Sequence, residues 1–191
     1  IPNEYKVASR ARVSASHPGW NSTQIETEAA RELHDATTDF FLAILRRIKT
    51  YAPHAKVGFY DMPHHYLYSW GYDGVNGDTY RARSNDLERI WREVDVLSPE
   101  TYLHVPVGTI YNSGYEQTEL DNSFFIGDAI RESIRLKAAF PNNQQIVTIG
   151  WYRYHDARSN PHRAQFLSSV DLRNQIFFGR QAGADGMLLW G

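Results

Sequence analysis

Four short apolar segments of the sequence run into aromatic and polar side chains. The segment ends carry, in chain order, Tyr60 with Asp61, Tyr102 with His104, Trp151, and finally Trp190. Tyr and Trp combine a flat apolar ring with a polar group, which suits stacking on a sugar ring and hydrogen bonding to its hydroxyls. The same rings could instead cap a hydrophobic core. Aromatic side chains at the ends of all four segments favour a groove that binds sugar.

The elements that would position these side chains alternate between strands and helices. We predict strands at 56–60, 101–105, 145–150 and 186–190, and helices at 24–50, 85–97, 122–138 and 169–182. Such alternation is typical of parallel strands joined by right-handed crossovers, and the functional site then lies at the carboxyl ends of the strands.

The predicted fold class is α/β, as a TIM-like (β/α) barrel. About four parallel strands are only half of the usual eight, so we expect an incomplete barrel whose N-terminal strands are missing from 1–191. An open doubly wound sheet is the alternative. No Gly-x-Gly-x-x-Gly follows a predicted strand, which disfavours the dinucleotide-binding form of that sheet.

Within the predicted strand 101–105, side chains should alternate between its two faces. Tyr102 and His104 would then share one face, toward the site, and Leu103 and Val105 the other. For the helix at 24–50, Thr23 and Glu26 predict a capping box at its start, and Pro53 predicts its end.

Composition narrows the class of partner. The 191 residues suffice for a single domain, 1–191, and 20 basic against 22 acidic side chains give a net charge of −2. This even mixture disfavours nucleic acid and membrane surfaces as partners, and no apolar run approaches the ~20 residues of a membrane-spanning helix. The chain has no cysteine, so it forms no disulfide within itself.

We expect no cofactor and no metal. The sequence holds no P-loop, no Gly-x-Ser-x-Gly and no His-Glu-x-x-His. His64 and His65 are adjacent and cannot converge on one metal without distortion, and His104 would join them only if the intervening loop folded over. Exposed loop histidines are the favoured interpretation.

In several segments the chain resembles the hyaluronidase family of glycoside hydrolases, family 56. GFYDMPHHY at 58–66 resembles Gly-Tyr/Phe-Tyr-x-Phe-Pro-Asp-Cys-Tyr, Asn85-Asp86-Leu87 with Ile90-Trp91 resembles Asn-Asp-x-Leu-x-Trp-Leu-Trp, SPETYL at 98–103 resembles Tyr-Pro-Ser-Ile-Tyr-Leu, RESIR at 131–135 resembles Arg-x-x-Glu-Ala-x-Arg, and 166–172 and 183–191 resemble the last helix and strand. These segments keep the family's order over nearly the whole chain.

The resemblance implies endo-cleavage of β-linked N-acetylhexosamine polymers of the hyaluronan and chondroitin type. In that family the acetamido oxygen of the substrate attacks the anomeric carbon, one Glu protonates the leaving oxygen, and an Asp and a Tyr steady the acetamido group. By resemblance Tyr102 takes the role of the tyrosine, a catalytic role, and Tyr60 and Trp190 bind the sugar. Asp61, beside Tyr60 at the strand end, is a further candidate for substrate binding.

Three departures from the family pattern bear on activity. The family's catalytic Asp-x-Glu belongs to a strand before the region matched here, and Asp86-Leu87-Glu88 is a decoy, because Ser84 or Asn85 with Glu88 predicts a helix cap. Ala129 stands about where the family carries an active-site arginine. The pair His64-His65 stands where the family has Asp-Cys, so the loop after it lacks the family's usual disulfide.

The leading hypothesis is therefore the C-terminal part of a secreted, extracellular hyaluronidase-like barrel with a polysaccharide substrate. The rival is a catalytically silent relative that binds glycan or serves as a structural module in an extracellular assembly. The missing N-terminal segment or other chains would be partners in either case. Asn21-Ser22-Thr23 is an N-glycosylation sequon, which fits a secreted glycoprotein.

Overall fold

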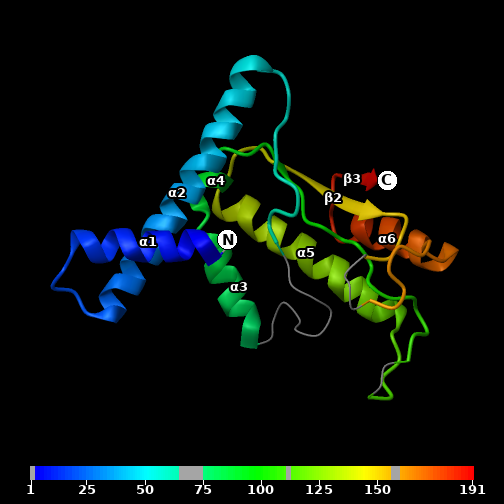
Figure 1. The fold of residues 1–191 in the computed structure, drawn as a ribbon. Helices are drawn as coiled ribbons and strands as arrows, with labels where there is room; N and C mark the ends of the chain where they lie inside the picture. The colour runs from blue at the N-terminus through cyan, green and yellow to red at the C-terminus, as the bar shows by residue number, and fades with distance from the viewer. Residues whose placement is uncertain (1–2, 65–74, 111–112, 156–159) are drawn as a thin grey trace. The chain divides into compact units, whose positions relative to one another are not determined.

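The computed structural model describes residues 3–64, 75–110, 113–155 and 160–191 (Figure 1). The chain divides into two compact units, Ile1–Pro53 and His54–Gly191. The single domain over 1–191 therefore stays a prediction, and each unit is described by itself. None of the described helices is long and apolar enough to cross a membrane.

The first unit is a pair of packed helices, α1 (Asn3–Ser16) and α2 (Ser22–Tyr51). The Ser9 hydroxyl donates to the Ala29 carbonyl at 2.9 Å, between buried faces of the two helices. The sequence did not predict α1. The long helix predicted at 24–50 is confirmed and ends before Pro53 as expected.

The predicted cap of α2 is wrong by two residues. Asn21, not Thr23, is the N-cap: its side chain accepts from the Gln24 backbone N–H at 3.0 Å, and the Gln24 side chain accepts from the Asn21 N–H at 3.0 Å. Asparagine is among the best N-cap residues, so the earlier start satisfies two helix-end donors. Thr23 instead lies inside the helix, where its carbonyl accepts from the Thr27 hydroxyl.

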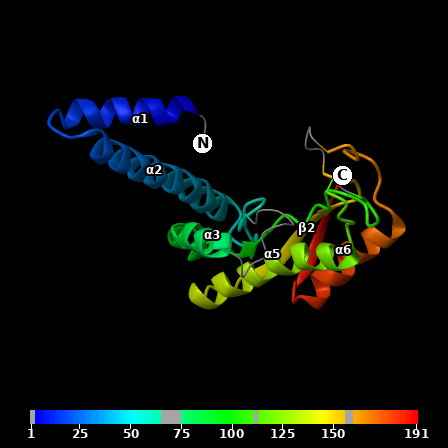
Figure 2. The same ribbon diagram turned by 90° about the horizontal axis from the view of Figure 1, so that it is seen from below.

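The second unit contains a parallel sheet in the order β1-β2-β3. Its strands are β1 (Val96–Leu97), β2 (Gln145–Trp151) and β3 (Gly186–Trp190). Helix α5 (Glu119–Ala139) packs against β2 and α6 (Ser169–Gln181) against β3, and the two helices pack against each other (Figure 2). This is the predicted strand-helix alternation with parallel pairing. The helices α3 (Val75–Asn85) and α4 (Glu88–Trp91) precede β1.

Two of the four predicted strands are confirmed, at β2 and β3. The segment at 56–60 makes only an isolated parallel bridge, between Gly58 and Val96. The segment at 101–105 is not a strand: the Thr101 carbonyl accepts from the Gln175 side chain at 2.7 Å, so a side chain takes the place of a strand partner. The paired residues lie a few positions earlier, in β1.

The predicted helices at 122–138 and 169–182 are confirmed as α5 and α6. The helix predicted at 85–97 is wrong in extent: α3 ends at Asn85, α4 covers only Glu88–Trp91, and the last two predicted positions belong to β1. Its apolar residues are nevertheless buried, with Ile90, Trp91 and Val94 almost inaccessible to solvent. They form the core with Leu97, Leu103, Ile126, Ile130, Leu136 and Ile146.

Asp171, at the start of α6, binds several segments together. It is fully buried, and its carboxylate accepts hydrogen bonds from Asn122 of α5 at 3.0 Å and from the Tyr154 hydroxyl at 2.6 Å. It also accepts from the Ser168 hydroxyl at 2.9 Å and from the Val107 backbone N–H at 3.4 Å. The loop after β1, the first turn of α5 and the segment after β2 therefore share one acceptor.

Candidate functional site

A backbone turn brings the end of the first predicted strand next to β1. Asp61 adopts a left-handed conformation with φ of 54°, which Asp tolerates better than most residues. The chain then returns to Ser98: the Met62 N–H donates to the Ser98 carbonyl at 3.3 Å, and the Ser98 N–H donates to the Met62 carbonyl at 2.7 Å. Tyr60 and Asp61 are thereby placed beside Glu100.

Tyr102 is held by the continuation of β2. The Thr101 N–H donates to the Ile149 carbonyl at 2.8 Å, and the His155 N–H donates to the Leu103 carbonyl at 2.9 Å. Tyr102 lies between these two hydrogen-bonded residues, and it is 7% exposed. The backbone that follows β2 therefore fixes the position of this ring.

Three aromatic rings lie close to Tyr102, and a fourth, that of His104, stacks on one of them. The Tyr102 ring centroid lies 6.3 Å from that of Tyr60, 5.8 Å from Trp151 and 6.1 Å from His155. His104 stacks on His155 at 4.5 Å with an angle of 3° between the planes. Tyr102 and His104 thus meet the same imidazole, although the segment that carries them is not a strand. We call Tyr60, Asp61, Glu100, Tyr102, Trp151 and His155 the strand-end cluster.

Glu100 is the residue that sequence reasoning missed. The Tyr60 hydroxyl donates a hydrogen bond to its carboxylate, and His155 Nε2 lies 3.5 Å from its Oε1. Burial raises the pKa of Glu100, and the nearby charge of Asp61 raises it further, against the lowering effects of Tyr60 and the histidines. The sequence did offer one signal for Glu100. It lies two residues before Tyr102, and in an extended segment side chains two residues apart point to the same face.

Asp61 lies next to Glu100 and pairs with His64, whose Nδ1 contacts its carboxylate. This hydrogen bond is the main reason that the pKa of His64 lies above its usual range. Burial chiefly, with hydrogen bonds to Glu100 and Tyr102, raises the pKa of Tyr60, so its phenol keeps its proton. The strand-end cluster thus contains two phenols, two acids and the imidazole of His155, and His64 adjoins it through Asp61.

His104 stays uncharged at neutral pH. Burial, reinforced by the charge of His155, lowers the pKa of His104 to about 4. The Asn160 side-chain amide donates to the His104 carbonyl at 2.5 Å and to the His155 carbonyl at 2.7 Å. Of the suggested histidine set, His65 lies outside the described residues, and no metal-binding group of three acidic or imidazole side chains occurs among those that the structure describes.

Trp190 is placed at the end of β3, where it is paired in register with Trp151 of β2. Its ring is 61% exposed. Trp190 therefore lies one strand beyond Trp151, on the other side of β2 from the segment that carries Tyr102, and its ring is accessible.

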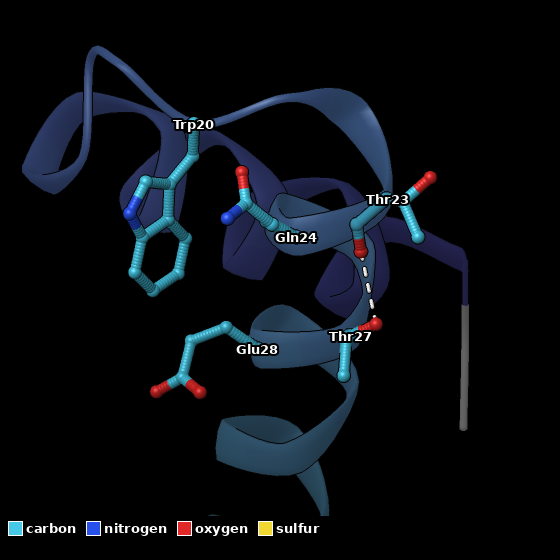
Figure 3. A pocket seen from close by; sticks show the side chains of 5 residues that line it. All are labelled: Trp20, Thr23, Gln24, Thr27 and Glu28. Carbon is cyan, nitrogen blue, oxygen red and sulfur yellow. Dashed lines mark hydrogen bonds between the residues drawn. The ribbon is translucent and has the colours of Figure 1, made fainter.

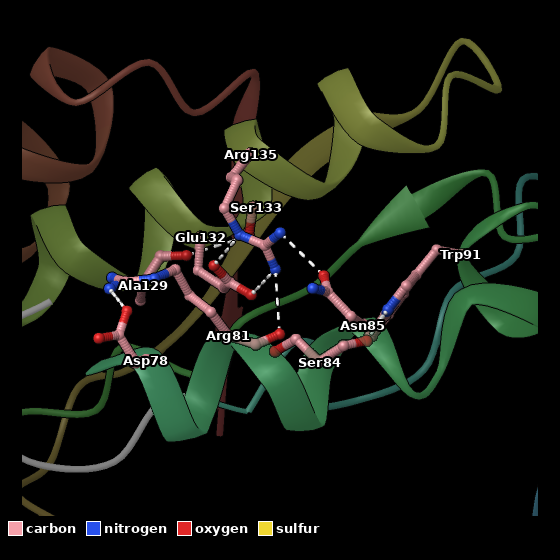
Figure 4. A network of polar contacts seen from close by, with 9 residues as sticks. All are labelled: Asp78, Arg81, Ser84, Asn85, Trp91, Ala129, Glu132, Ser133 and Arg135. Atoms are coloured by element: carbon pink, nitrogen blue, oxygen red, sulfur yellow. Dashed lines mark hydrogen bonds and ion pairs between the residues drawn. The ribbon is translucent and has the colours of Figure 1, made fainter. Parts of the chain in front are cut away.

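Ala129 and the Asp86-Leu87-Glu88 triplet lie outside the strand-end cluster. Ala129 is fully buried in α5, and its carbonyl accepts from the Ser133 hydroxyl at 3.1 Å (Figure 4). Glu88 forms an exposed ion pair with Arg92 at 2.6 Å. The predicted cap is wrong, because the N-cap of α4 is Leu87, which has no side-chain cap bond.

Asn21 is exposed at the start of α2, and only its amide oxygen is used by the helix cap. Beside it, a shallow pocket is lined by Trp20, Thr23, Gln24, Thr27 and Glu28 (Figure 3). The capping geometry leaves the amide nitrogen, which is the atom that N-glycosylation modifies, outside the capping bonds.

Comparison with known proteins places this geometry in context. The family described as hyaluronidase, glycoside hydrolase family 56, matches residues 2–191. Hyaluronidase-2 of Mus musculus is 29% identical over 192 residues, covering 98% of this chain and 38% of the relative. The hyaluronidase of Apis mellifera is 25% identical over 189 residues, covering 98% and 46%.

Solved structures of a hyaluronidase are also similar to this chain. Bee venom hyaluronidase aligns with a TM-score of 0.75 and 24% identity over 99% of this chain and 56% of its own. The same enzyme in complex with a hyaluronic acid tetramer aligns with a TM-score of 0.78 and 25% identity, covering 98% and 54%. The chain thus spans between about a third and about a half of the relatives that it matches.

Proposed function

Because the chain belongs to the hyaluronidase family of glycoside hydrolases, we propose that it forms part of an enzyme that cleaves β-linked N-acetylhexosamine polymers of the hyaluronan and chondroitin type. The observation that carries this proposal is the strand-end cluster, in which the rings of Tyr60 and Tyr102 lie 6.3 Å apart beside the half-buried acid Glu100. The polysaccharide would lie over these rings, with Trp190 and Asp61 at its margin. The hyaluronic acid tetramer bound by the bee venom enzyme supports a polysaccharide ligand.

The proposed fold of the complete protein is a TIM-like (β/α) barrel, to which residues 1–191 contribute the C-terminal strands. Three parallel strands in sequence order, with α5 and α6 between them, support this arrangement. We further propose that the protein is secreted, as the family resemblance and the Asn21 sequon suggest.

In the proposed mechanism the acetamido oxygen of the substrate attacks its own anomeric carbon, and a carboxylic acid outside residues 1–191 protonates the leaving oxygen. Tyr102 would donate its hydroxyl to the acetamido group as charge develops there. A donor that acts in the transition state affects turnover more than substrate binding. The buried position of the ring supports this role, because a fixed donor needs no reorganisation during the reaction.

The second candidate is a catalytically silent relative that binds glycan or serves as a structural module. Ala129 favours it, since a buried methyl group stands where the family pattern has an arginine.

The test is release of reducing ends from hyaluronan and chondroitin by the complete protein, with any sequence that flanks residues 1–191. We expect Tyr102→Phe to lower turnover by about ten- to a thousand-fold, with little change in substrate affinity. Tyr115→Phe, at an exposed tyrosine bonded to Asp121, is the matched control and should behave like wild type. If the wild type releases no reducing ends, the catalytically silent relative is favoured. If Tyr102→Phe turns over like the wild type, the proposed catalytic role of the Tyr102 hydroxyl is wrong.

Occupancy of Asn21 is tested by expression in a secreting eukaryotic cell. We expect enzymatic deglycosylation to lower the mass of the wild type and to leave that of Asn21→Gln unchanged. An identical mass before and after treatment of the wild type would contradict glycosylation.

A further inference from the structure

The segment that follows Trp151 folds back on itself just beyond the carboxyl end of β2. The Tyr154 N–H and the Leu167 N–H each donate to a carbonyl of the opposing segment at 2.9 Å. Between these two bonds, Arg153 and Phe166 form an antiparallel bridge pair. The two side chains of such a pair stand opposite each other on the same face, so the backbone presents Arg153 together with Phe166.

The guanidinium of Arg153 lies against two aromatic rings. Its Cζ is 4.0 Å from the centroid of the Phe166 ring and 5.5 Å from that of the Tyr152 ring, and these two rings stack with centroids 5.7 Å apart. Nη1 of Arg153 also donates to the carbonyl of Ala164, which has φ of 58°, an uncommon conformation for alanine. Rings and carbonyl together fix the position of this cation.

Arg153 retains donors for a ligand. A guanidinium carries five N–H donors in a planar fork, and of the described residues only Ala164 accepts a hydrogen bond from it. Phe166 beside it is 66% exposed. The planar fork matches the two oxygens of a carboxylate, and an arginine that is already held in place loses less freedom on binding. We call Tyr152, Arg153 and Phe166 the arginine platform.

A run of rings connects the arginine platform to the strand-end cluster. Ring centroids are 5.8 Å apart between Tyr102 and Trp151, 6.4 Å between Trp151 and Tyr152, and 5.7 Å between Tyr152 and Phe166. Aromatic rings offer flat apolar faces of the kind that sugar rings stack on. A glycan bound at Tyr102 therefore has further rings beside it, and these lead to Arg153.

We propose that the arginine platform is a subsite for the carboxylate of a uronic acid sugar, and that Arg153 is its specificity-determining residue. In hyaluronan and chondroitin, sugars with a carboxylate alternate with the N-acetylhexosamine units that the proposed function assigns to Tyr102. The inference rests on that function, because it assumes that such a polymer lies over the strand-end cluster. It assigns the preference for a charged over a neutral polymer to one side chain.

The test compares two forms of one ligand on the complete protein at neutral pH and low salt. Calorimetry gives dissociation constants for a hyaluronan oligosaccharide and for its carboxyl-reduced form, in which a hydroxymethyl group replaces each carboxylate. We expect the wild type to bind hyaluronan more tightly than the reduced form. Arg153→Gln should weaken binding of hyaluronan by about tenfold or more, as expected for a lost hydrogen bond between charged groups, and leave the reduced form unchanged.

Arg92→Gln is the matched control. Arg92 also lies over an aromatic ring, that of Phe140 at 5.4 Å, but it precedes β1 and so belongs to the opposite end of the parallel sheet. This variant loses the same charge and should keep both wild-type affinities. Near-UV circular dichroism checks the fold. Arg153→Met, which keeps a long apolar side chain against Phe166, decides the case if Arg153→Gln does not fold.

The outcomes separate the subsite from the proposed function. If the wild type binds both forms equally, or if Arg153→Gln keeps the wild-type affinity for hyaluronan or weakens both forms to the same extent, the carboxylate subsite is wrong and the glycan site stands. If neither form binds the wild type, the proposed function itself fails, and the subsite with it.

Discussion

At the scale of single residues, Tyr60 and Tyr102 differ in how the protein holds them. Tyr102 is buried and contacts three rings, whereas Tyr60 is 56% exposed and is fixed by its bond to Glu100. An exposed ring with its hydroxyl already committed is suited to stacking. A buried ring is suited to positioning a hydroxyl. The two tyrosines therefore have separate tasks in the proposed site, namely affinity for Tyr60 and turnover for Tyr102.

We expect Tyr60→Ala to weaken binding of an N-acetylhexosamine oligomer by roughly 1–3 kcal/mol, because it removes the stacking surface. Trp190→Ala should have an effect in the same range if its exposed ring also stacks. Titration calorimetry on the complete protein measures both, with Tyr115→Ala as the control at an exposed ring that is not part of the strand-end cluster. If the folded variants bind the oligomer with wild-type affinity, both rings only cap the core and do not bind the glycan.

His104 makes stability depend on pH. Its pKa of about 4 in the folded protein lies below the usual 6.5, so the unfolded chain binds a proton first as the pH falls. Its contribution is complete above pH ~6.5 and is lost progressively down to pH ~4. We expect it to lower the free energy of unfolding by about 2 kcal/mol between pH 7 and pH 5.

Denaturant unfolding at both pH values measures this loss. His104→Gln should show a smaller change between pH 7 and pH 5 than wild type, and His54→Gln, at an exposed histidine, should match wild type. Equal pH dependence in His104→Gln and wild type would contradict the assignment.

At the scale of elements, α3 and α5 are joined by hydrogen bonds from Arg135, which also forms an ion pair with Glu132 within α5. Arg135 donates to both oxygens of Glu132 at 2.7 Å, to the Asn85 side chain at 2.9 Å and to the Arg81 carbonyl at 3.5 Å (Figure 4). Glu132 is 4% exposed. A buried acid of this kind depends on its partner, because an unpaired charge in the interior is costly.

Arg135→Ala should therefore lower the free energy of unfolding by about 3 kcal/mol, since it leaves the Glu132 carboxylate buried and unpaired. Chemical denaturation of the complete protein provides the measurement. The control is Arg173→Ala, which removes a loose and exposed pair with Glu119 at 3.9 Å and should cost under about 1 kcal/mol. If Arg135→Ala lowers the free energy of unfolding no more than Arg173→Ala does, the stabilising role of Arg135 is contradicted.

Helices and strands were predictable from sequence where the local spacing of apolar residues alone determines them. Helices α5 and α6 follow from apolar residues at helical spacing, and β2 and β3 follow from short apolar runs. The strand at 101–105 failed because Gln175, far along the chain, supplies the partner of Thr101. Glu100 was missed for a similar reason: its environment is made by Tyr60 and His155, which are distant in sequence. Contacts between remote residues are not visible in local periodicity.

At the scale of the whole molecule, β3 is an edge strand within the part of the chain that the structure describes. Its only described partner is β2, and its side chains Leu188, Leu189 and Trp190 are about half exposed or more. An exposed apolar edge strand offers unpaired backbone groups to another chain. In the proposed barrel, further strands would cover it.

Residues 1–191 expressed alone should therefore self-associate or remain partly unfolded. Light scattering and chemical denaturation at increasing protein concentration provide the measurement, and the complete protein is the control. A monomer with a single cooperative unfolding transition would contradict a missing part of the barrel.

The position of Asp171 along the chain has a consequence for the order of events during synthesis. Its carboxylate is the shared acceptor for Val107, Asn122 and Tyr154, all of which leave the ribosome before it. The bonds of these segments to Asp171 cannot form until the start of α6 has been translated. The backbone next to Tyr154 carries His155 and, through it, the loop with Tyr102. A nascent chain thus acquires its strand-end cluster late, after almost all of the 191 residues have been made.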